Sequence, residues 1–291
     1  MPYRLDSPPR VCDRGGVARV GALVEQLRRT VREPSRLRRL HYSTVLAAAH
    51  GVVEPDDAGV LARVFGTDRA AQDRLVDRLV ADLVGDGEFT DALDRRHRDV
   101  RGTGLRLFAD ASERDADARL RLLYCCVRLL RPRRVVETGV FDGVSTCVIL
   151  KALADDGGDG RLVSTDLPPH APVPGSTDKM AATTLPPGQR SGWLVPDGLR
   201  ARWTLHEGAA RELLPAVLDA SGGLDVFFHD SLHTTAHMTW EYDVAWPAIV
   251  GGGLLLTDDV FWSTAFWRFC RRRRVRGVVA RGMGIARKPP F

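Results

Sequence analysis

The chain has 291 residues, of which 44% are hydrophobic and 27% charged, with a formal net charge of +5. This composition is ordinary for a globular protein, and no run approaches the roughly 20 apolar residues that span a bilayer. The five cysteines form no CxxC pair, which argues against a disulfide framework or a zinc knuckle. The N-terminus lacks the apolar core of a signal peptide, so we expect a cytoplasmic protein.

The positive charge is carried almost entirely by arginine, and its densest run is Arg271–Arg274. Nucleic-acid binding requires basic residues gathered on one face, whereas acids are interspersed through most of this chain. We therefore expect a solvated, arginine-rich surface, with neither nucleic acid nor a membrane as partner. The wealth of arginine and alanine is typical of a GC-rich bacterial genome, which fits a role in secondary metabolism.

The N-terminal part, residues 1–115, is predicted to be a tail followed by a helical module. Residues 1–16 are rich in proline, glycine and charge. From Val17 to Val100 apolar residues recur at three- and four-residue steps, as in Leu23–Val31 and Leu75–Leu83. Glu54–Asp57 has the pattern of a helix start. No strand is expected here, and such a module is compatible with capping a site or forming a homodimer.

Residues 116–291 show a different pattern, in which apolar β-rich runs alternate with helical stretches. A helix over Arg119–Leu130 ends before Pro132. The alternating segments are Arg134–Glu137, Ser145–Ala154, Arg161–Asp166, Trp203–His206, Arg211–Ala220, Leu224–His229, Ala236–Trp246 and Gly253–Thr257. This alternation predicts an α/β fold with a Rossmann-like, doubly wound, mostly parallel sheet, and Val275–Ala280 with Gly282–Arg287 predicts a C-terminal antiparallel hairpin.

The link between Asp166 and Trp203 is unusually long for a compact domain. It is rich in proline, glycine and serine and contains Trp193. We interpret it as a flap on the substrate side, although an insertion without function explains its central part equally well.

The most informative motif is the glycine turn from Glu137 through Gly139, Phe141 and Gly143 to Ser145. An apolar run ends in an acid, the turn follows, and a helix begins. Free N–H groups at a helix start bind anions, and an acid at the lip can bind an ammonium or a hydroxyl. The motif therefore suits a ligand that carries both a carboxylate and an amine, such as the methionine end of S-adenosylmethionine. An ordinary tight turn between strand and helix is the alternative.

Further polar or small residues follow the next strands, where ligands bind in parallel sheets. Asp166 ends the second strand and can accept both hydroxyls of a ribose. After the third strand, Gly208 and Ala210 are small enough for an adenine to lie flat against the backbone. Acids at such places often cap helices. Their repetition along one edge is hard to explain by capping alone.

Three aspartates, Asp230, Asp258 and Asp259, follow the fourth and fifth strands. Converging carboxylates repel one another, and a divalent cation removes that repulsion. Oxygen ligands suit Mg²⁺. The alternative is that one aspartate caps a helix, another contacts the ligand, and no metal binds.

His233 lies three residues after Asp230, so we expect it one turn into the next helix and facing the same way. Its ordinary pKa allows it to accept a proton near neutral pH. His229 and His237 share its four-residue spacing, but His229 closes a strand. We therefore expect no zinc site, and His237 is expected at the helix surface or in packing.

Together these residues resemble the class I S-adenosylmethionine-dependent methyltransferases, most closely the metal-dependent small-molecule O-methyltransferases of the catechol and cephalosporin-biosynthesis types. The resemblance covers roughly Leu120 to the C-terminus. It implies that Glu137–Ser145 is the cofactor loop, with Ser145 on the methionine carboxylate. Asp166 would bind the ribose, and Ala210 and Arg211 would lie near the adenine.

The same resemblance places the metal ligands at Asp230, Asp258 and Asp259, and makes Asp230 both a cofactor contact and a catalytic residue. The third ligand of the catechol enzymes is an amide, so Asp259 adds a negative charge. His233 falls where those enzymes carry a catalytic lysine.

The implied reaction is transfer of a methyl group to an oxygen of a small-molecule acceptor, with His233 as base and Mg²⁺ on the hydroxyl. Alternatives are metal-independent methylation of a nitrogen or a carboxylate, and a metal-dependent hydrolase without cofactor affinity. A nucleic-acid binder that uses Arg271–Arg274 is disfavoured, because the aspartate-lined edge would repel phosphates.

Overall fold

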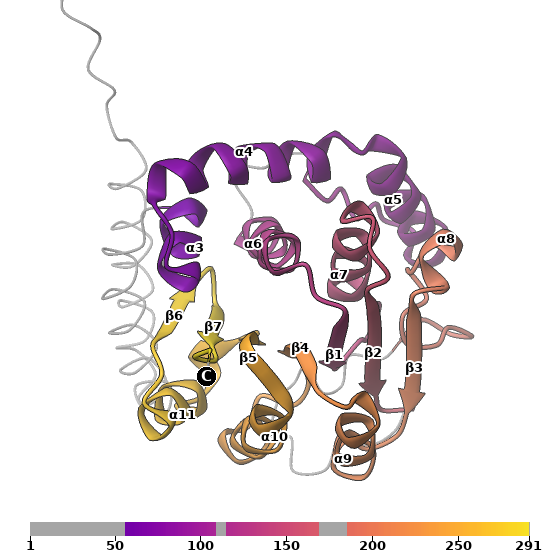
Figure 1. Cartoon of the computed structure of the whole chain (residues 1–291). Coiled ribbons are helices and arrows are strands. Elements are labelled where there is room, and N and C mark those ends of the chain that lie inside the picture. The colour runs from indigo at the N-terminus through magenta and orange to yellow at the C-terminus, as the bar shows by residue number, and fades with distance from the viewer. Residues whose placement is uncertain (1–55, 109–114, 169–184, 291) are drawn as a thin grey trace, which may run out of the picture. The chain divides into compact units, whose positions relative to one another are not determined.

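The computed structural model describes residues 56–108, 115–168 and 185–290. In these residues seven strands form one sheet in the order β3-β2-β1-β4-β5-β7-β6 (Figure 1). β1 to β5 are parallel, and β7 is antiparallel to both β5 and β6. The strands are β1 (Arg134–Thr138), β2 (Arg161–Asp166), β3 (Trp203–Glu207), β4 (Leu224–His229), β5 (Ile249–Thr257), β6 (Gly277–Ala280) and β7 (Met283–Arg287). The predicted α/β sheet with its C-terminal antiparallel hairpin is confirmed.

Successive residues of the central strands face two different helical layers. Val135 and Phe228 belong to one buried cluster, with the leucines of α6 (Asp115–Leu130) and α7 (Val144–Asp155). Val136 and Phe227 belong to the other cluster. The helices of that second layer are α9 (Ala210–Ser221), α10 (Thr235–Ala248) and α11 (Ala265–Arg273) (Figure 1). The connections thus change face between β1 and β4, where a doubly wound sheet opens a crevice.

From Asp56 onward, three helices precede α6 in the described part of the chain, as the periodicity predicts for it. They are α3 (Asp57–Phe65), α4 (Arg69–Gly85) and α5 (Gly87–Arg101). An aspartate caps each N-terminus: Asp56, Asp68 and Asp86 accept from backbone N–H groups at 2.6, 3.0 and 2.9 Å. The helix start predicted at Glu54–Asp57 is therefore confirmed at Asp56. The predicted tail and the helical stretch around Leu23–Val31 lie outside the described residues.

The described residues belong to one compact unit, Val52–Phe291. Leu61, Leu83 and Leu93 of α3, α4 and α5 are fully buried and share a core cluster with α6 and α7. A domain boundary after residue 115 stays a prediction.

β5 begins at Ile249, four residues before the predicted start. The run Gly251–Gly253 hides this part of the strand in the sequence, because glycine is unfavourable inside strands. A Cβ on Gly253 would lie 2.6 Å from the carbonyl oxygen of Asp225, and the pairing of β4 with β5 shifts register here. Glycine is therefore required at a bulge.

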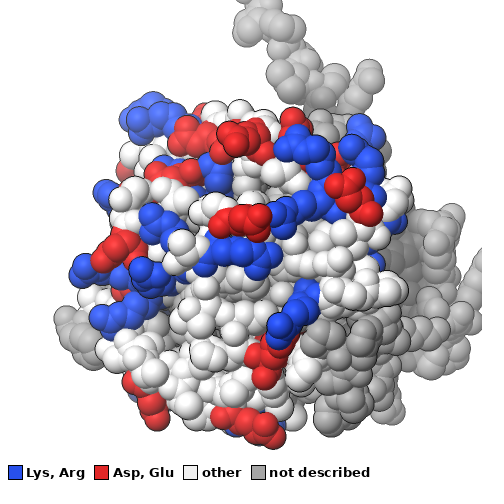
Figure 2. Space-filling view, turned by 90° about the vertical axis from the view of Figure 1, so that its right-hand side faces the viewer, with Lys and Arg blue, Asp and Glu red and all other residues white. Residues whose placement is uncertain are grey.

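Charges of both signs are mixed over the face that carries α8 (Asp197–Arg200) and β3 (Figure 2). Arg96 pairs with Asp197 at 3.2 Å, and Arg190 pairs with Glu207. The C-terminal arginine run is also compensated in part, since Arg272 and Arg273 both pair with Asp243.

The cysteines and the hydropathy of the helices can both be examined in the described ranges. Cys125, Cys126, Cys147 and Cys270 are free and buried, as small apolar residues would be. Cys12 lies outside these ranges. Among residues 56–108, 115–168 and 185–290, no helix has the length and apolar character needed to cross a membrane.

Candidate functional site

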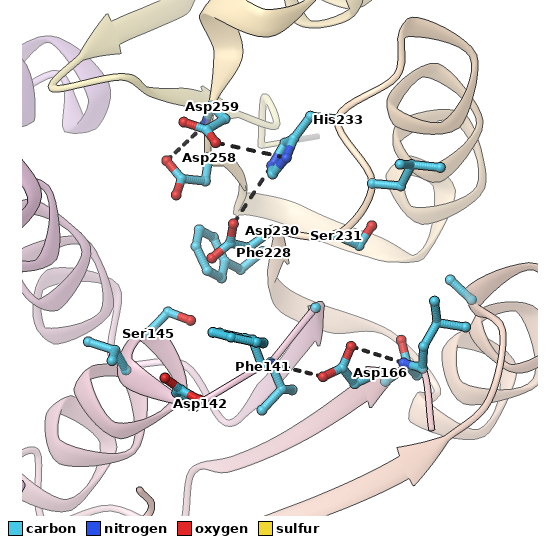
Figure 3. A pocket seen from close by; sticks show the side chains of 18 of the residues that line it. Phe141, Asp142, Ser145, Asp166, Phe228, Asp230, Ser231, His233, Asp258 and Asp259 are labelled. Atoms are coloured by element: carbon cyan, nitrogen blue, oxygen red, sulfur yellow. Dashed lines mark hydrogen bonds and ion pairs between the residues drawn. The ribbon is translucent and has the colours of Figure 1, made fainter. Parts of the chain in front are cut away.

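A cavity of about 930 Å³ opens at the carboxyl edge of the sheet, among the loops that follow β1 to β5 (Figure 3). On another side it is bounded by α6 and by the segment around Leu105 and Leu107. Every predicted site residue except Glu137 lines it: Gly139, Phe141, Gly143, Ser145, Asp166, Gly208, Ala210, Arg211, Asp230, His233, Asp258 and Asp259. The structure thus brings together residues from five separate loops.

The loop between β1 and α7 requires glycine at two positions. Gly139 and Gly143 have φ of 85° and 94°, in the left-handed region. A Cβ on Gly139 would lie 2.1 Å from the carbonyl oxygen of Asp230, and one on Gly143 would lie 2.8 Å from Cα of Gly192. The loop can therefore lie against the chain after β4 only with glycine there. No side chain caps the N-terminus of α7, which leaves its N–H groups available to an anion.

The turn motif predicts Glu137 at the lip of this loop, but the structure places Glu137 beneath the loop. Its side chain is fully buried and accepts hydrogen bonds from the hydroxyls of Ser145, Thr146 and Ser164 at 3.0, 2.8 and 2.7 Å. Burial raises the pKa of Glu137 to about 7, against the opposing effect of these hydroxyls. Glu137 holds the loop from below and does not face the cavity.

Asp166, at the end of β2, is tied to the backbone on both sides. Its Oδ2 accepts from the N–H of Phe141 at 2.8 Å, and its Oδ1 accepts from the N–H of Leu167 at 2.9 Å (Figure 3). Each oxygen keeps a second lone pair. Asp166 therefore fixes the glycine loop while its carboxylate still lines the cavity.

The segment after β3 narrows the same side of the cavity. Gly208 donates to the carbonyl oxygen of Asp166 at 2.8 Å, and a Cβ on Gly208 would lie 2.8 Å from Cδ1 of Leu213. The guanidinium carbon of Arg211 stands 4.6 Å from the ring centroid of Trp240, a cation–π distance. Arg211 is thus held in place by an aromatic ring.

Asp230, Asp258 and Asp259 meet at the other end of the cavity, together with an arginine that the sequence did not indicate. Nη1 of Arg119 lies 2.8 Å from Oδ1 and 2.7 Å from Oδ2 of Asp258, and 3.9 Å from Oδ1 of Asp259. Enclosure and the charges of its two neighbours raise the pKa of Asp230, and burial raises that of Asp258. Arg119 opposes both shifts.

His233 does not lie in a helix, which corrects the prediction from its spacing. α10 begins only at Thr235, because the hydroxyl of Thr234 caps it by accepting from the N–H of His237. His233 nevertheless reaches the acids: Nε2 is 3.7 Å from Asp230 Oδ1, and Nδ1 is 3.8 Å from Asp259 Oδ2 (Figure 3). Burial, followed by the nearby His229, lowers the pKa of His233 to about 3, so its imidazole is neutral at pH 7.

The three aspartates do not fit a divalent cation as they lie. Within the described ranges, no group of three or more His, Cys, Asp or Glu side chains is arranged to hold a metal ion. Both oxygens of Asp258 face Arg119. The predicted metal is therefore not carried into the mechanism below.

A buried carboxylate behind His233 was missed by sequence reasoning. Glu241 of α10 is fully buried and accepts from Thr138, Ser231 and His237 at 2.6, 2.8 and 2.8 Å, and it lies 2.5 Å from Nδ1 of His229. Burial alone would raise the pKa of Glu241, but His229 and the hydrogen bonds hold it below its usual value. His237, predicted as a surface or packing residue, is one of the hydrogen-bond partners of Glu241. The four-residue step from His237 to Glu241 was the available signal.

The loop between β1 and α7 is also braced from α5, through contacts distant in the sequence. Asp142 receives two hydrogen bonds from Arg101, at 3.0 and 2.8 Å, and a third from the indole of Trp193 at 2.7 Å. Trp193 is buried, and the N–H of Gly192 donates to the carbonyl oxygen of Phe141. This part of the long link therefore packs against the loop. The centre of the predicted flap lies outside the described residues.

The strand order, the glycine turn after β1, the acid after β2 and the cavity at the crevice together define the fold of a class I S-adenosylmethionine-dependent methyltransferase. Residues 136–260 match the family model of a methyltransferase domain. That match spans all the strand ends that line the cavity. The matched part of the chain is thus a methyltransferase domain with the fold of the S-adenosylmethionine-dependent enzymes, and the hydrolase alternative is set aside.

Solved structures to which the chain is similar include three methyltransferases. The O-methyltransferase TomG from Streptomyces achromogenes, in complex with SAM, is 20% identical with a TM-score of 0.45, and the match covers 70% of this chain and 91% of that one. SAH-bound PaMTH1 from Podospora anserina is 17% identical with a TM-score of 0.44, and the match covers 68% of this chain and 88% of that one. The O-methyltransferase from Bacillus cereus in complex with SAH is 15% identical with a TM-score of 0.41, and the match covers 68% of this chain and 97% of that one. No curated protein sequence matches the chain.

The raised pKa of Glu137 predicts a pH-dependent stability that Glu137→Gln removes. An unfolded glutamate ionises near its ordinary pKa of 4.5, whereas folded Glu137 keeps its proton up to about pH 7. Stability from this proton is present below pH 4.5 and is lost as pH rises through 7, by roughly 3 kcal/mol in total. Urea unfolding without cofactor should show the variant gaining on the wild type between pH 5 and 7.5. A constant difference across this range would contradict the assignment.

The brace on Asp142 predicts that Arg101→Ala weakens cofactor binding. A charge-assisted pair of hydrogen bonds is worth about 1.5–3 kcal/mol, so the Kd for S-adenosylhomocysteine should rise roughly 10-fold in calorimetry. Arg98→Ala is the matched control, because Arg98 lies on the same helix and its side-chain partner in the described ranges is Asp94, which is not part of the loop. Equal affinities in the two variants would show that α5 does not support the loop.

Proposed function

We propose that the chain transfers a methyl group from S-adenosylmethionine to an oxygen of a small-molecule acceptor. The observation that carries the proposal is the single cavity that unites the glycine loop, Asp166, His233 and the aspartate cluster. A cavity of about 930 Å³ is large enough for a cofactor of this size together with a small acceptor. A role in secondary metabolism is part of the same proposal and rests on composition alone.

The cofactor would lie along the loops after β1, β2 and β3. Gly139 and Gly143 let the methionine part approach the backbone, and the N-terminus of α7 with Ser145 offers donors to its carboxylate. The free lone pairs of Asp166 suit the ribose hydroxyls. Ala210 and the stacked side chain of Arg211 would border the adenine. Glu137 acts indirectly in this arrangement, by holding Ser145 from below.

The acceptor would lie between this cofactor and the aspartate cluster. When bound, S-adenosylmethionine supplies the methyl group, whose bond to sulfur breaks as its bond to the acceptor oxygen forms. His233 is neutral, so it can take the proton of the acceptor hydroxyl. Asp230 and Asp259, at 3.7 and 3.8 Å, would then stabilise the imidazolium. The low pKa of His233 makes it a weak base in the empty cavity.

A nitrogen or a carboxylate is the alternative acceptor, because neither needs a metal. A carboxylate carries no proton at neutral pH, so its methylation would not require His233. Substituting His233 therefore separates the alternatives as well as testing the proposal.

Calorimetric titration with S-adenosylhomocysteine tests the cofactor assignment. We expect saturable binding, weakened at least about 10-fold by Asp166→Ala because the ribose loses charged acceptors. Asp159→Ala is the control, since Asp159 is exposed and pairs with Arg133 at the surface. Absence of heat with both S-adenosylmethionine and its demethylated product would refute the proposed function.

His233→Ala tests the base. With an acceptor identified by S-adenosylhomocysteine release from a panel of small hydroxyl compounds, we expect turnover to fall about 10²–10⁴-fold. The affinity for S-adenosylhomocysteine should stay the same. His206→Ala, an exposed histidine in β3 that does not line the cavity, should leave both unchanged. Undiminished turnover of His233→Ala would remove this residue from the reaction.

A further inference from the structure

The acceptor end of the cavity gathers three carboxylates and one guanidinium. Asp230 and Asp258 follow the neighbouring strands β4 and β5, and Asp259 is next in the chain. Ionised carboxylates so placed repel one another, so the cluster requires a compensating positive charge. A divalent cation is one way to provide it. The protein provides a second way, a positively charged side chain of its own.

Arg119 provides that charge from α6. Its Nη1 lies 2.7 and 2.8 Å from the two oxygens of Asp258 and 3.9 Å from Asp259. The carboxylate of Asp258 is almost fully buried, at 6% exposure, and such a pair is stronger than one at the surface. Among the described residues, the other arginine that lines the cavity is Arg211, which is stacked on Trp240. Arg119 is therefore the cavity-lining arginine that pairs with Asp258.

The position of Arg119 is fixed by the packing of α6. The helix is buried against α7 along its length, and the hydroxyl of Tyr124 donates to Asp155 of α7 at 2.6 Å. A residue on such a helix is placed more accurately than one on a loop. A metal bound to Asp258 would lie within a few ångström of this guanidinium, where like charges repel strongly.

We infer that Arg119 takes the place of a divalent cation at the acceptor end of the cavity: it neutralises Asp258 and Asp259 and binds the acceptor oxygen with its remaining N–H groups. The second half of this inference rests on the proposed methyl transfer, whereas the first half rests on geometry alone. Only Nη1 is engaged by the residues that the structure describes. Nε and Nη2 are left as donors for an oxygen of the acceptor.

The surroundings define the chemistry of that acceptor. Apolar side chains make up much of the lining outside the strand-end loops, namely Leu105, Leu107, Leu120, Leu123, Trp262 and Met283, and the polar Asp117 among them accepts from the N–H of Phe108. A site of this kind binds a molecule by its apolar body and orients it by a few polar contacts. The acceptor is thus a largely apolar compound whose hydroxyl lies between Arg119 and His233.

The test is a Mn²⁺ titration of the full-length, cofactor-free protein, followed by electron paramagnetic resonance of the free ion. Wild-type protein should bind no Mn²⁺ at the cluster. Arg119→Met leaves Asp258 without its guanidinium partner, and it should bind Mn²⁺ at least about 10-fold more tightly than the wild type. Adding Asp258→Asn to this variant should abolish the gain. Arg133→Met, which also unpairs an aspartate but at the surface, should bind no more than the wild type.

Two results would overturn the inference. One is Mn²⁺ binding by the wild type that Asp258→Asn abolishes; the other is a folded Arg119→Met variant that gains no affinity. If Arg119→Met does not fold, Arg119→Lys replaces it: the lysine keeps the charge, so it should exclude Mn²⁺ as the wild type does, and binding would count against the inference. Wild-type turnover should also be unchanged by EDTA. Because Mn²⁺ binding needs no cofactor, its result is independent of whether S-adenosylhomocysteine binds.

Discussion

The loops after β1 and β4 touch at their backbones, and the rest of the site is arranged around that contact. Gly139 approaches Asp230 so closely that any side chain at position 139 would overlap the carbonyl of residue 230. The N–H of Asp230 also donates to the carbonyl oxygen of Thr138 at 2.8 Å. These strands are neighbours at the place where the helical connections change face. The distance from the glycine loop to the aspartate cluster is therefore set by the sheet and not by flexible side chains, as in-line transfer between two bound molecules requires.

Electrostatic compensation is the second constraint, and the chain meets it differently in two places. Beneath the loop, Glu137 is surrounded by hydroxyls and favours its protonated form up to about pH 7. Behind His233, Glu241 is surrounded by donors and histidines and stays ionised. The two acids are both fully buried, so the difference arises from their partners and not from their burial. At the acceptor end, the corresponding partner is Arg119.

The sequence was sufficient for the architecture and for most of the cavity lining. Apolar runs ending in Glu137, Asp166 and His229 mark the strand ends directly, because parallel strands bring their carboxyl ends to one edge. Orientation could not be read in the same way. Glu137 points beneath the loop because strand residues alternate between faces and three hydroxyls meet it there. His233 precedes its helix because Thr234 is the better cap. Arg119 and Arg101 could not be found, since each acts across more than 40 positions of the sequence, and neither lies in a motif.

The brace between Arg101 and Asp142 connects the helices before the sheet to the loop that lines the cavity. If binding of the nucleoside orders the loop, the same free energy must strengthen the hold of that loop on α5, because linkage between two sites is reciprocal. A protein or small molecule that binds α5 and stabilises its present position would therefore raise the affinity for the methyl donor without contacting the cavity. Conversely, an agent that pulls α5 away would release the spent nucleoside. The helices before the sheet would then regulate turnover from a distance.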